Sequence, residues 1–462
     1  MTTKNNFIGR MVMVLCTTVL ILSSCQKDTS TGGIYPKSLD YSLRVPMIWN
    51  QLYLDIERFT PGYKPPVSAR NFGYISLIAY ESIVNGSNGA YRSMSNHYSD
   101  INLSLPEFNE EYNWEVVLNT AYERSFELYF PTAPSEQQFR ILEVAGDLRS
   151  KLQSETDFEV YQRSSRYGKY IAEEIFDWSS IDTWGHEAYL HNIDPAYVPP
   201  QDEGYWKPTY PDYGEALLPH WGKVKTFAAE ETDVVVAPPT WSTDPNSQIY
   251  KEALFTQELT NRVRGGEAEE DYWIAEFWSD DCPILTFTPA GRWVSITNQV
   301  VSIEGQTMMD AVATYAQVGM ALSDAGIKCW QEKYKYNMLR PIDYIREFMD
   351  DPEWNTVMCP DGSGGFYTPN FPTYPSGHAT FGGAAAFVLG QIYGDEYDFT
   401  DRSHEGRLEF RGSPRSYSSF SEMAEENAYS RVPLGVHFSS DSDAGLALGR
   451  RIGRKVNRLP WR

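Results

Sequence analysis

Apolar residues recur at intervals of three and four along most of this chain, and this spacing constrains its fold more than any other feature. Because a helix turns once every 3.6 residues or so, the spacing places these side chains on one helical face. The stretches with this pattern are 45–59, 69–86, 111–130, 135–178, 247–263, 269–278 and 305–338. Alternation with a period of two, typical of half-buried strands, is scarce. The sequence therefore predicts an all-α protein built from helical bundles.

The last quarter of the chain combines helices with loops. Further helical stretches are 378–394, 418–430 and 439–458. The residues before the first of them, 358–375, are rich in glycine and proline and predict a loop. A proline- and tyrosine-rich stretch at 194–219 has no periodicity, and it predicts a long surface loop or cover.

The charge balance excludes one group of partners. The chain has 462 residues, 42 % of them hydrophobic, so it can bury a large core. Its 39 Lys and Arg residues face 62 Asp and Glu residues, which gives a formal net charge of −23. A surface of this sign repels nucleic acid and anionic membranes. Any anion site must therefore be a local arrangement of basic side chains.

Residues 1–24 have the features of an export signal. Two basic residues precede an apolar run, 11–22, that is too short to span a bilayer comfortably. The sequence LSSC, which ends at Cys25, resembles the lipobox of bacterial lipoproteins. We therefore expect a signal peptide, a lipid on Cys25, a tether at 25–36 and a body held at a membrane of a bacterial cell envelope. An uncleaved anchor helix is the alternative.

Three cysteines remain in that body, Cys282, Cys329 and Cys359, and no pair has the spacing of a metal site. One disulfide is possible in an oxidising compartment, and ordinary buried thiols are the alternative. Five histidines form no ligand-spaced cluster with these cysteines and are interpreted as structural. They are His97, His186, His191, His220 and His404.

The first of three chemically informative stretches is KYKYNMLRP, which contains Lys333 and Arg340. Two helical turns bring side chains seven residues apart to the same face, about 10 Å apart along the axis. Their charged groups can then converge on one small anion. A solvated basic stripe is the alternative. Trp330, one turn earlier, and Pro341, which we expect to end the helix, argue against it.

The second stretch is PSGH, residues 375–378, at the start of a predicted helix. Ser376 offers a hydroxyl, and Gly377 lets its backbone N–H approach a ligand closely. The first turn of the helix adds unsatisfied N–H groups, which suit an oxyanion. His378 can exchange a proton near neutral pH. An N-capping serine followed by a packing glycine is the alternative.

The third stretch is SRVPLGVHFSSD, residues 430–441. The proline and glycine between Arg431 and His437 predict a turn that brings the guanidinium beside the imidazole. Asp441 follows His437 by four residues, on the same face of a helix. Its carboxylate can accept a hydrogen bond from one ring nitrogen and leave the other free as a nucleophile or ligand. A simple surface contact is the alternative.

Together these stretches supply two guanidinium groups, an ammonium group, a hydroxyl, a backbone N–H and two histidines. Guanidinium groups match tetrahedral oxyanions bidentately, and three cations neutralise a multiply charged one. Nothing in this set suits a divalent cation. The sequence therefore predicts an oxyanion site.

At these positions the chain resembles the vanadium-dependent haloperoxidases and the type 2 phosphatidic acid phosphatases, which share the pattern K-x6-RP, PSGH and SR-x5-H-x3-D. The matching residues are Lys333, Arg340, Pro341, Pro375, Ser376, Gly377, His378, Ser430, Arg431, His437 and Asp441. The resemblance extends more loosely over 270–460. It implies the helical bundles of that superfamily, with a catalytic bundle at 266–462 after an N-terminal helical region at 37–265.

The resemblance also implies a role for each residue. His437 would bind the vanadium of vanadate in a peroxidase, or attack phosphorus in a phosphatase. His378 would be the acid-base group, and Lys333 would polarise bound peroxide. The cofactor is then vanadate, although phosphate could occupy the same site. The residues that would hold its oxygens are Arg340, Ser376, Gly377 and Arg431.

Flanking residues resemble the haloperoxidase branch. Trp330 and Phe371 would line the halide side of the site. Asp281, with Asp280 directly before it, resembles an aspartate that pairs with the arginine at position 431. The phosphatidic acid phosphatases usually carry several membrane helices, which we do not find in this sequence.

We therefore expect a vanadate-dependent haloperoxidase, an oxidoreductase that uses hydrogen peroxide to oxidise a halide to hypohalous acid. An acid phosphatase acting through a phosphohistidine is the first alternative. The second is a lipid-anchored ligand-binding protein, which the 14 % aromatic content and the N-terminus suggest. Two histidines with distinct roles in one anion site argue against this second alternative.

Overall fold

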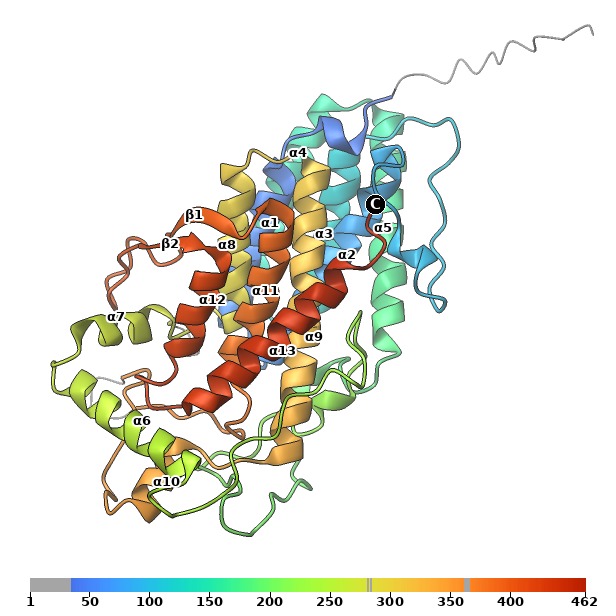
Figure 1. The fold of residues 1–462 in the computed structure, drawn as a ribbon. Helices are drawn as coiled ribbons and strands as arrows, with labels where there is room; N and C mark the ends of the chain where they lie inside the picture. The colour runs from blue at the N-terminus through green and yellow to red at the C-terminus, as the bar shows by residue number, and fades with distance from the viewer. Residues whose placement is uncertain (1–34, 281, 283–284, 361–365) are drawn as a thin grey trace, which may run out of the picture. The chain divides into compact units, whose positions relative to one another are not determined.

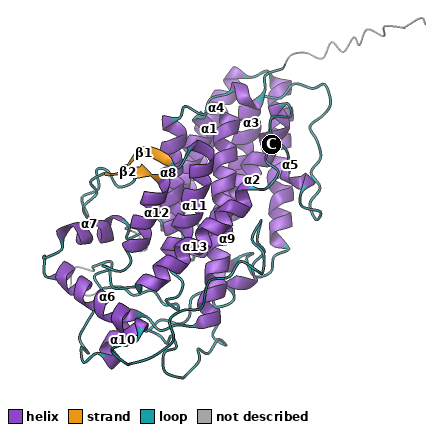
Figure 2. Cartoon of the chain, viewed as in Figure 1, coloured by secondary structure: helices purple, strands orange, loops and turns teal. Residues whose placement is uncertain are grey.

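The computed structural model describes residues 35–280, 282, 285–360 and 366–462. Tyr35–Arg462 forms one compact unit. In its described part, thirteen α-helices accompany one two-stranded sheet (Figures 1 and 2). The predicted all-α class is confirmed. The signal peptide 1–24, Cys25 and all but the last two residues of the 25–36 tether lie outside the described residues and stay predictions.

The N-terminal half begins with five α-helices in the four predicted stretches, because the stretch 135–178 is divided into two helices. They are α1 (Arg44–Phe59), α2 (Pro65–Val84), α3 (Trp114–Tyr129), α4 (Ser135–Glu155) and α5 (Phe158–Ser180). Local signals set their first turns: the Asn113 side chain accepts from two backbone N–H groups of α3, and Asp157 caps α5 in the same way. Every residue of α2 is buried, so this helix lies inside the unit.

The remaining helices include two that the sequence pattern did not predict. The full set is α6 (Gln248–Arg264), α7 (Glu269–Phe277), α8 (Pro289–Ile303), α9 (Met308–Tyr336), α10 (Pro341–Phe348), α11 (Gly377–Tyr393), α12 (Phe420–Tyr429) and α13 (Ser439–Asn457). The unpredicted ones are α8 and α10. The sequence of α8 is rich in β-branched residues and reads as strand as easily as helix, and tertiary packing decides such cases.

Short elements complete the described fold. The antiparallel strands β1 (Glu396–Asp401) and β2 (Arg415–Ser419) pair between α11 and α12, with Phe399 opposite Tyr417. This hairpin was also not predicted. The short 3-10 helices are Ser38–Asp40, Asn85–Ser87, Met94–Asn96, Ala188–Leu190 and Trp221–Lys223. No described helix is long and apolar enough to cross a membrane.

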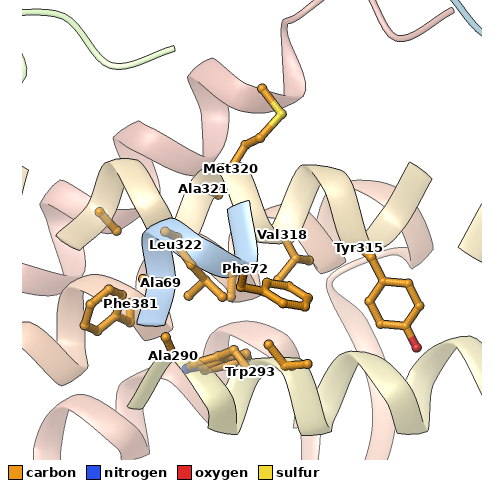
Figure 3. Packing of buried hydrophobic residues seen from close by; sticks show 14 of the residues in the cluster. Ala69, Phe72, Ala290, Trp293, Tyr315, Val318, Met320, Ala321, Leu322 and Phe381 are labelled. Carbon is orange, nitrogen blue, oxygen red and sulfur yellow. The ribbon is translucent and has the colours of Figure 1, made fainter. Parts of the chain in front are cut away.

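The long helix α9 is the centre of the hydrophobic core. Its residues 311–330 are all buried, as expected of a helix that is covered on every side. Figure 3 shows Leu322 of this helix near Phe72 of α2 and Trp293 of α8. One core cluster joins residues from both halves of the chain, so the two halves fold as one unit. The boundary between 37–265 and 266–462 stays a prediction.

Glycines let α11 and α13 approach each other closely. A Cβ atom on Gly449 would lie 2.2 Å from the carbonyl oxygen of Thr380, and one on Gly445 would lie 2.5 Å from that of Ser376. Real Cβ atoms never come so close to backbone, so only glycine fits here. The contact fixes the start of α11 against α13, and His378 lies in that first turn.

A disulfide joins Cys282, before α8, to Cys359, in the loop before α11. The third cysteine of the described residues, Cys329, is an unpaired thiol buried in α9. The sequence left both outcomes open, and the structure shows one disulfide and one buried thiol.

We expect Gly449→Ala to destabilise the protein by about 1–3 kcal/mol, because the added methyl group overpacks the contact between α11 and α13. Gly146→Ala in α4 is the matched control, since a Cβ atom there meets nothing within 4 Å. The control should be neutral or slightly stabilising, by up to about 1 kcal/mol. Urea unfolding of both variants measures the difference. Equal midpoints would contradict the close contact.

Candidate active site

Three segments that are distant in sequence meet where α9 ends and where α11 and α13 begin. The Nζ atom of Lys333, on α9, donates to the backbone carbonyls of Pro372 (2.8 Å) and Thr373 (2.9 Å), before α11. The backbone N–H of Ser376 donates to the carbonyl of Asp441 (2.9 Å), in the first turn of α13. The three sequence motifs therefore form one cluster.

Lys333 and Arg340 reach this cluster by a route that the sequence did not predict. Helix α9 ends at Tyr336 because Asn337 adopts the left-handed conformation (φ 45°), so no helix carries both basic residues. Arg340 is the extended N-cap of α10, and Pro341 starts that helix instead of ending the previous one. The predicted shared helical face is wrong, although both residues belong to the cluster.

Backbone carbonyls orient the Arg340 guanidinium group. Its Nε atom donates to the carbonyl of Phe371 (2.8 Å), and its Nη1 atom donates to the carbonyl of Val436 (2.8 Å). These acceptors belong to the other two segments of the cluster. Arg340 therefore ties the turn before α13 to the loop before α11.

Arg431 lies in the predicted turn between α12 and α13, and it is 1 % exposed. Its Nη1 atom donates to the carbonyl of Trp278 (3.2 Å), and its Nη2 atom lies 3.5 Å from the sulfur of Met358. Gly435 gives this turn its positive φ of 81°. Asp281, the expected carboxylate partner, lies outside the described residues, so that pairing stays a prediction.

Its neighbour Asp280 has different partners. The carboxylate is fully buried and accepts from Arg292 Nε (2.9 Å), and it lies 3.2 Å from His404 Nε2. Arg292 belongs to α8, the helix that the sequence did not predict. Arg292 adds a positive charge that the motifs did not reveal. This charge is close enough to the site to act on His378.

His378 is buried in the first turn of α11. Ser376 caps this helix, and Gly377 is its first residue. Burial lowers the pKa of the His378 imidazole well below the ordinary value, and the nearby cations lower it further. Those cations are Arg431, Arg292, Lys333 and Arg340. The ring is therefore neutral. Its Nε2 atom is buried and has no hydrogen-bond partner among the described residues.

His437 and Asp441 form the predicted pair, with His437 Nδ1 3.0 Å from Asp441 Oδ2. The two residues do not share a helical face as predicted, because His437 precedes α13 and only Asp441 lies in that helix. The same carboxylate oxygen accepts from the backbone N–H of Phe438 (3.0 Å) and so caps α13. Burial raises the pKa of Asp441 to about 7, while burial and the nearby cations lower the pKa of His437.

Thr373 completes this pair, and the sequence motifs did not identify it. Its Oγ1 atom lies 2.5 Å from Asp441 Oδ2 and 3.0 Å from His437 Nδ1. Above its raised pKa, Asp441 is ionised and its carboxylate only accepts, so Thr373 then donates to Asp441 and accepts from Nδ1–H of His437. This places the ring proton on Nδ1 and leaves the Nε2 lone pair available as a ligand or nucleophile. The only signal in the sequence is a hydroxyl side chain three residues before Ser376.

Trp330 and Phe371 lie together beside the basic residues, as expected for one side of the site. Their ring centroids are 4.9 Å apart. The Phe371 centroid is 5.1 Å from Lys333 Nζ and 4.8 Å from Arg340 Cζ. The two rings therefore form an apolar wall that keeps water from these cations and strengthens their field.

The 194–219 stretch supports this wall. It contains no helix or strand, as predicted, and Leu217 in it belongs to the hydrophobic core. The Leu217 carbonyl accepts from Trp330 Nε1 (3.2 Å) and from the Tyr334 hydroxyl (2.7 Å). The Leu217 N–H donates to the carbonyl of Asn370 (3.0 Å), next to Phe371. The stretch is thus a cover that fixes the indole of Trp330.

The arrangement fits an anion with several oxygens. Three buried cations lie around two neutral histidines, and the described residues contain no group of His, Cys, Asp or Glu that could hold a metal cation. A Cβ atom on Gly377 would meet only Trp330, at 3.5 Å, so space remains beside its backbone. The unpartnered Nε2 atom of His378 can donate to an anion oxygen once the ring is protonated. Because a bound anion offsets the cations, it raises the pKa of His378 and favours that proton.

Fold and site together define a helical-bundle protein with a buried cationic oxyanion site. Residues 313–459 match the family model described as the VCPO second helical-bundle domain. The vanadium chloroperoxidase of Curvularia inaequalis is 24 % identical over 88 % of this chain and 80 % of its own length. The vanadium-dependent bromoperoxidase of Ascophyllum nodosum is 36 % identical over 95 residues, which are 18 % of this chain and 17 % of that protein.

Two solved structures have a fold similar to that of this chain. The crystal structure described as the first bacterial vanadium-dependent iodoperoxidase has a TM-score of 0.76 and 28 % identity, and the match covers 91 % of this chain and 97 % of that one. A holo-type bacterial vanadium-dependent chloroperoxidase has a TM-score of 0.62 and 13 % identity, over 87 % and 93 %. The chain is therefore similar in sequence to the vanadium chloroperoxidase over most of its length, and it has the helical fold of the vanadium haloperoxidases.

We expect Thr373→Val to weaken vanadate binding by about 10-fold or more, because the loss of the hydroxyl frees the tautomer and orientation of His437. Valine keeps the shape of threonine, so packing is preserved. Thr373→Ser keeps the hydroxyl and should restore the affinity to within about threefold. Calorimetric titration with orthovanadate gives both values. If the valine and serine variants bind equally, Thr373 does not position His437.

Proposed function

We propose that this protein is a vanadate-dependent haloperoxidase that oxidises a halide with hydrogen peroxide to hypohalous acid. The observation that carries the proposal is the buried group formed by Thr373, His437 and Asp441 beside three cations. A buried histidine that is held through Nδ1 and lies in the field of Arg340, Lys333 and Arg431 suits an oxyanion cofactor. The relatives named above are a chloroperoxidase, a bromoperoxidase and an iodoperoxidase, and they support the same activity.

The residues of the cluster fit vanadate. Lys333, Arg340 and Arg431 would neutralise its charge, and the Ser376 hydroxyl and the Gly377 N–H would donate to its oxygens. His437 Nε2 would be the protein's ligand to the vanadium. When bound, vanadate activates hydrogen peroxide for oxygen transfer to a halide without a change in the oxidation state of the metal.

The chain's own residues would control the protons of the reaction. Halide, peroxide and one proton give hypohalous acid and water, so each turnover takes up a proton. His378 is the group suited to supply it, since its Nε2 atom lies buried in the site without another partner. Lys333 Nζ is held by its hydrogen bonds to two backbone carbonyls, and it would polarise peroxide. Trp330 and Phe371 would exclude water from the halide side.

The test is peroxide-dependent oxidation of iodide and bromide by the chain without residues 1–24, after loading with orthovanadate. We expect activity that requires vanadate and falls by at least about 1000-fold in His437→Ala, because the ligand to the cofactor is lost. His97→Ala is the matched control, since His97 is exposed and lies outside the cluster. It should retain full activity. Equal activity in the two variants would refute the assigned role of His437.

The second candidate is an acid phosphatase acting through a phosphohistidine. Phosphate has the same shape and charge as vanadate, and the same cations would hold it. Hydrolysis of phenyl phosphate by the vanadate-free protein, measured in parallel, separates the two functions. Hydrolysis without halide oxidation, abolished in His437→Ala, would establish the phosphatase. A protein inactive in both assays would have to be treated as an anchored ligand-binding protein.

We also propose that the protein is exported and lipid-anchored through Cys25 to a bacterial envelope membrane. The support is the basic start, the short apolar run at 11–22 and the LSSC sequence. We expect the full chain, expressed in a bacterium, to sediment with membranes, and Cys25→Ser to be released from them. Equal sedimentation of both forms would contradict the lipid anchor and favour the uncleaved helix.

A further inference from the structure

Helix α13 begins without a capping side chain of its own. Its N-cap residue is Phe438, which has no side-chain oxygen to accept a hydrogen bond. The regular hydrogen bonds of a helix leave its first N–H groups without a partner. Serine, threonine, asparagine or aspartate usually provides an acceptor at this position. The first turn of α13 therefore depends on acceptors from other residues.

A carboxylate from a different helix provides one of these acceptors. The Oε2 atom of Glu252, on α6, accepts from the backbone N–H of Ser440 (3.1 Å) and from the hydroxyl of the same serine (2.7 Å). The Oε1 atom accepts from the side-chain amide of Gln248 (2.8 Å), one turn earlier on α6. Both carboxylate oxygens of Glu252 are thus held, and the negative charge suits the N-terminus of α13.

The turn that Glu252 caps makes two contacts within the candidate active site. Asp441 directly follows Ser440, and its Oδ2 atom lies 3.0 Å from Nδ1 of His437. The backbone carbonyl of Asp441 accepts from the N–H of Ser376 (2.9 Å), at the start of α11. A shift of this turn would therefore displace the partner of His437 and the start of α11 together.

Glu252 is distant from the sequence motifs of the site. It lies 188 residues before Ser440, and α6 is outside the residues 313–459 that match the family model. The Glu252 side chain borders an open cavity of about 450 Å³ that Ser439 also lines. Water from this cavity can replace a missing carboxylate at the Ser440 N–H. Variants at position 252 should therefore fold, with a less fixed first turn of α13.

We propose that Glu252 is a positioning residue for His437, which it reaches through the first turn of α13 and Asp441. The inference rests on the proposed function, in which His437 Nε2 is the ligand to the vanadium. The contacts run from Glu252 to Ser440, along the backbone to Asp441, and from its carboxylate to Nδ1 of His437. Groups that orient a ligand from behind affect how tightly the ligand binds. Glu252 thus extends the support of His437 to a helix outside the catalytic motifs.

The first test observes the His437 ring in the vanadate-free protein. NMR of isotope-labelled histidine, at a pH above the raised pKa of Asp441, shows which ring nitrogen carries the proton, and His437→Gln assigns the signal. We expect the proton on Nδ1 in the wild type and a mixture of both tautomers in Glu252→Ala. Glu258→Ala, at an exposed position of the same helix, is the matched control and should give the wild-type signal. An unchanged signal in Glu252→Ala would overturn the proposal.

The second test is calorimetric titration of the vanadate-free protein with orthovanadate. We expect Glu252→Ala to bind vanadate about fivefold more weakly, a smaller loss than for a direct partner of the histidine. Glu252→Gln keeps an oxygen for the N–H and hydroxyl of Ser440, and it should restore the affinity to within about twofold. A glutamine variant as weak as the alanine variant would refute the role of these hydrogen bonds.

A cap elsewhere in the fold separates positioning from stability. Asn113 caps α3 by accepting from two backbone N–H groups. Asn113→Ala and Glu252→Ala should both lower the midpoint of urea unfolding, because each loses a helix cap. Only Glu252→Ala should weaken vanadate binding. Equal vanadate affinities in these two variants would show that Glu252 stabilises the fold without positioning His437.

The NMR signal and the titration need no turnover, so they test Glu252 separately from the proposed function. A wild type that oxidises no halide, together with a changed His437 signal in Glu252→Ala, would refute the haloperoxidase and leave Glu252 as a positioning residue of another anion site. Halide oxidation by the wild type, with the same His437 signal in both proteins, would refute the positioning role alone.

Discussion

The fold of the site depends on the burial of Lys333, Arg340 and Arg431. A charged group inside a protein costs several kcal/mol unless polar partners replace its lost water. Here Lys333 and Arg340 donate to backbone carbonyls in the segment before α11 and in the turn before α13. Those segments have little regular structure of their own, so the cations proposed to bind the anion also hold these loops in place. The loss of any one cation would loosen these loops and would also weaken the binding of an anion.

The histidines gain their different properties from their surroundings. Both rings are neutral because burial and nearby cations oppose a further positive charge. His437 differs in having Asp441 and Thr373 on Nδ1, which fixes its orientation. His378 has no such partner on Nε2 and so remains free to take a proton when an anion arrives. One residue is therefore suited to hold a ligand, and the other to exchange protons with it.

The sequence predicted the members of the site better than the geometry that joins them. The motifs identified Lys333, Arg340, His378, His437 and Asp441. Anion binding and proton transfer each require particular side chains, and these can be recognised in a sequence. The helical face proposed for Lys333 and Arg340 was wrong, since the left-handed Asn337 ends α9 between them. The motifs did not identify Thr373 and Arg292, because these residues act through contacts with residues that are distant in sequence. Helix α8, the β1–β2 hairpin and the role of Leu217 were missed for the same reason.

The three cysteines of the described residues would limit damage by the hypohalous acid of the proposed reaction. Such oxidants attack thiolates far faster than neutral thiols. Burial raises the pKa of Cys329, which keeps this residue as a sealed, neutral thiol within α9. Cys282 and Cys359 already share a bond. The described part of the chain thus exposes no free thiol to the hypohalous acid of the proposed reaction, which would protect the enzyme from its own product.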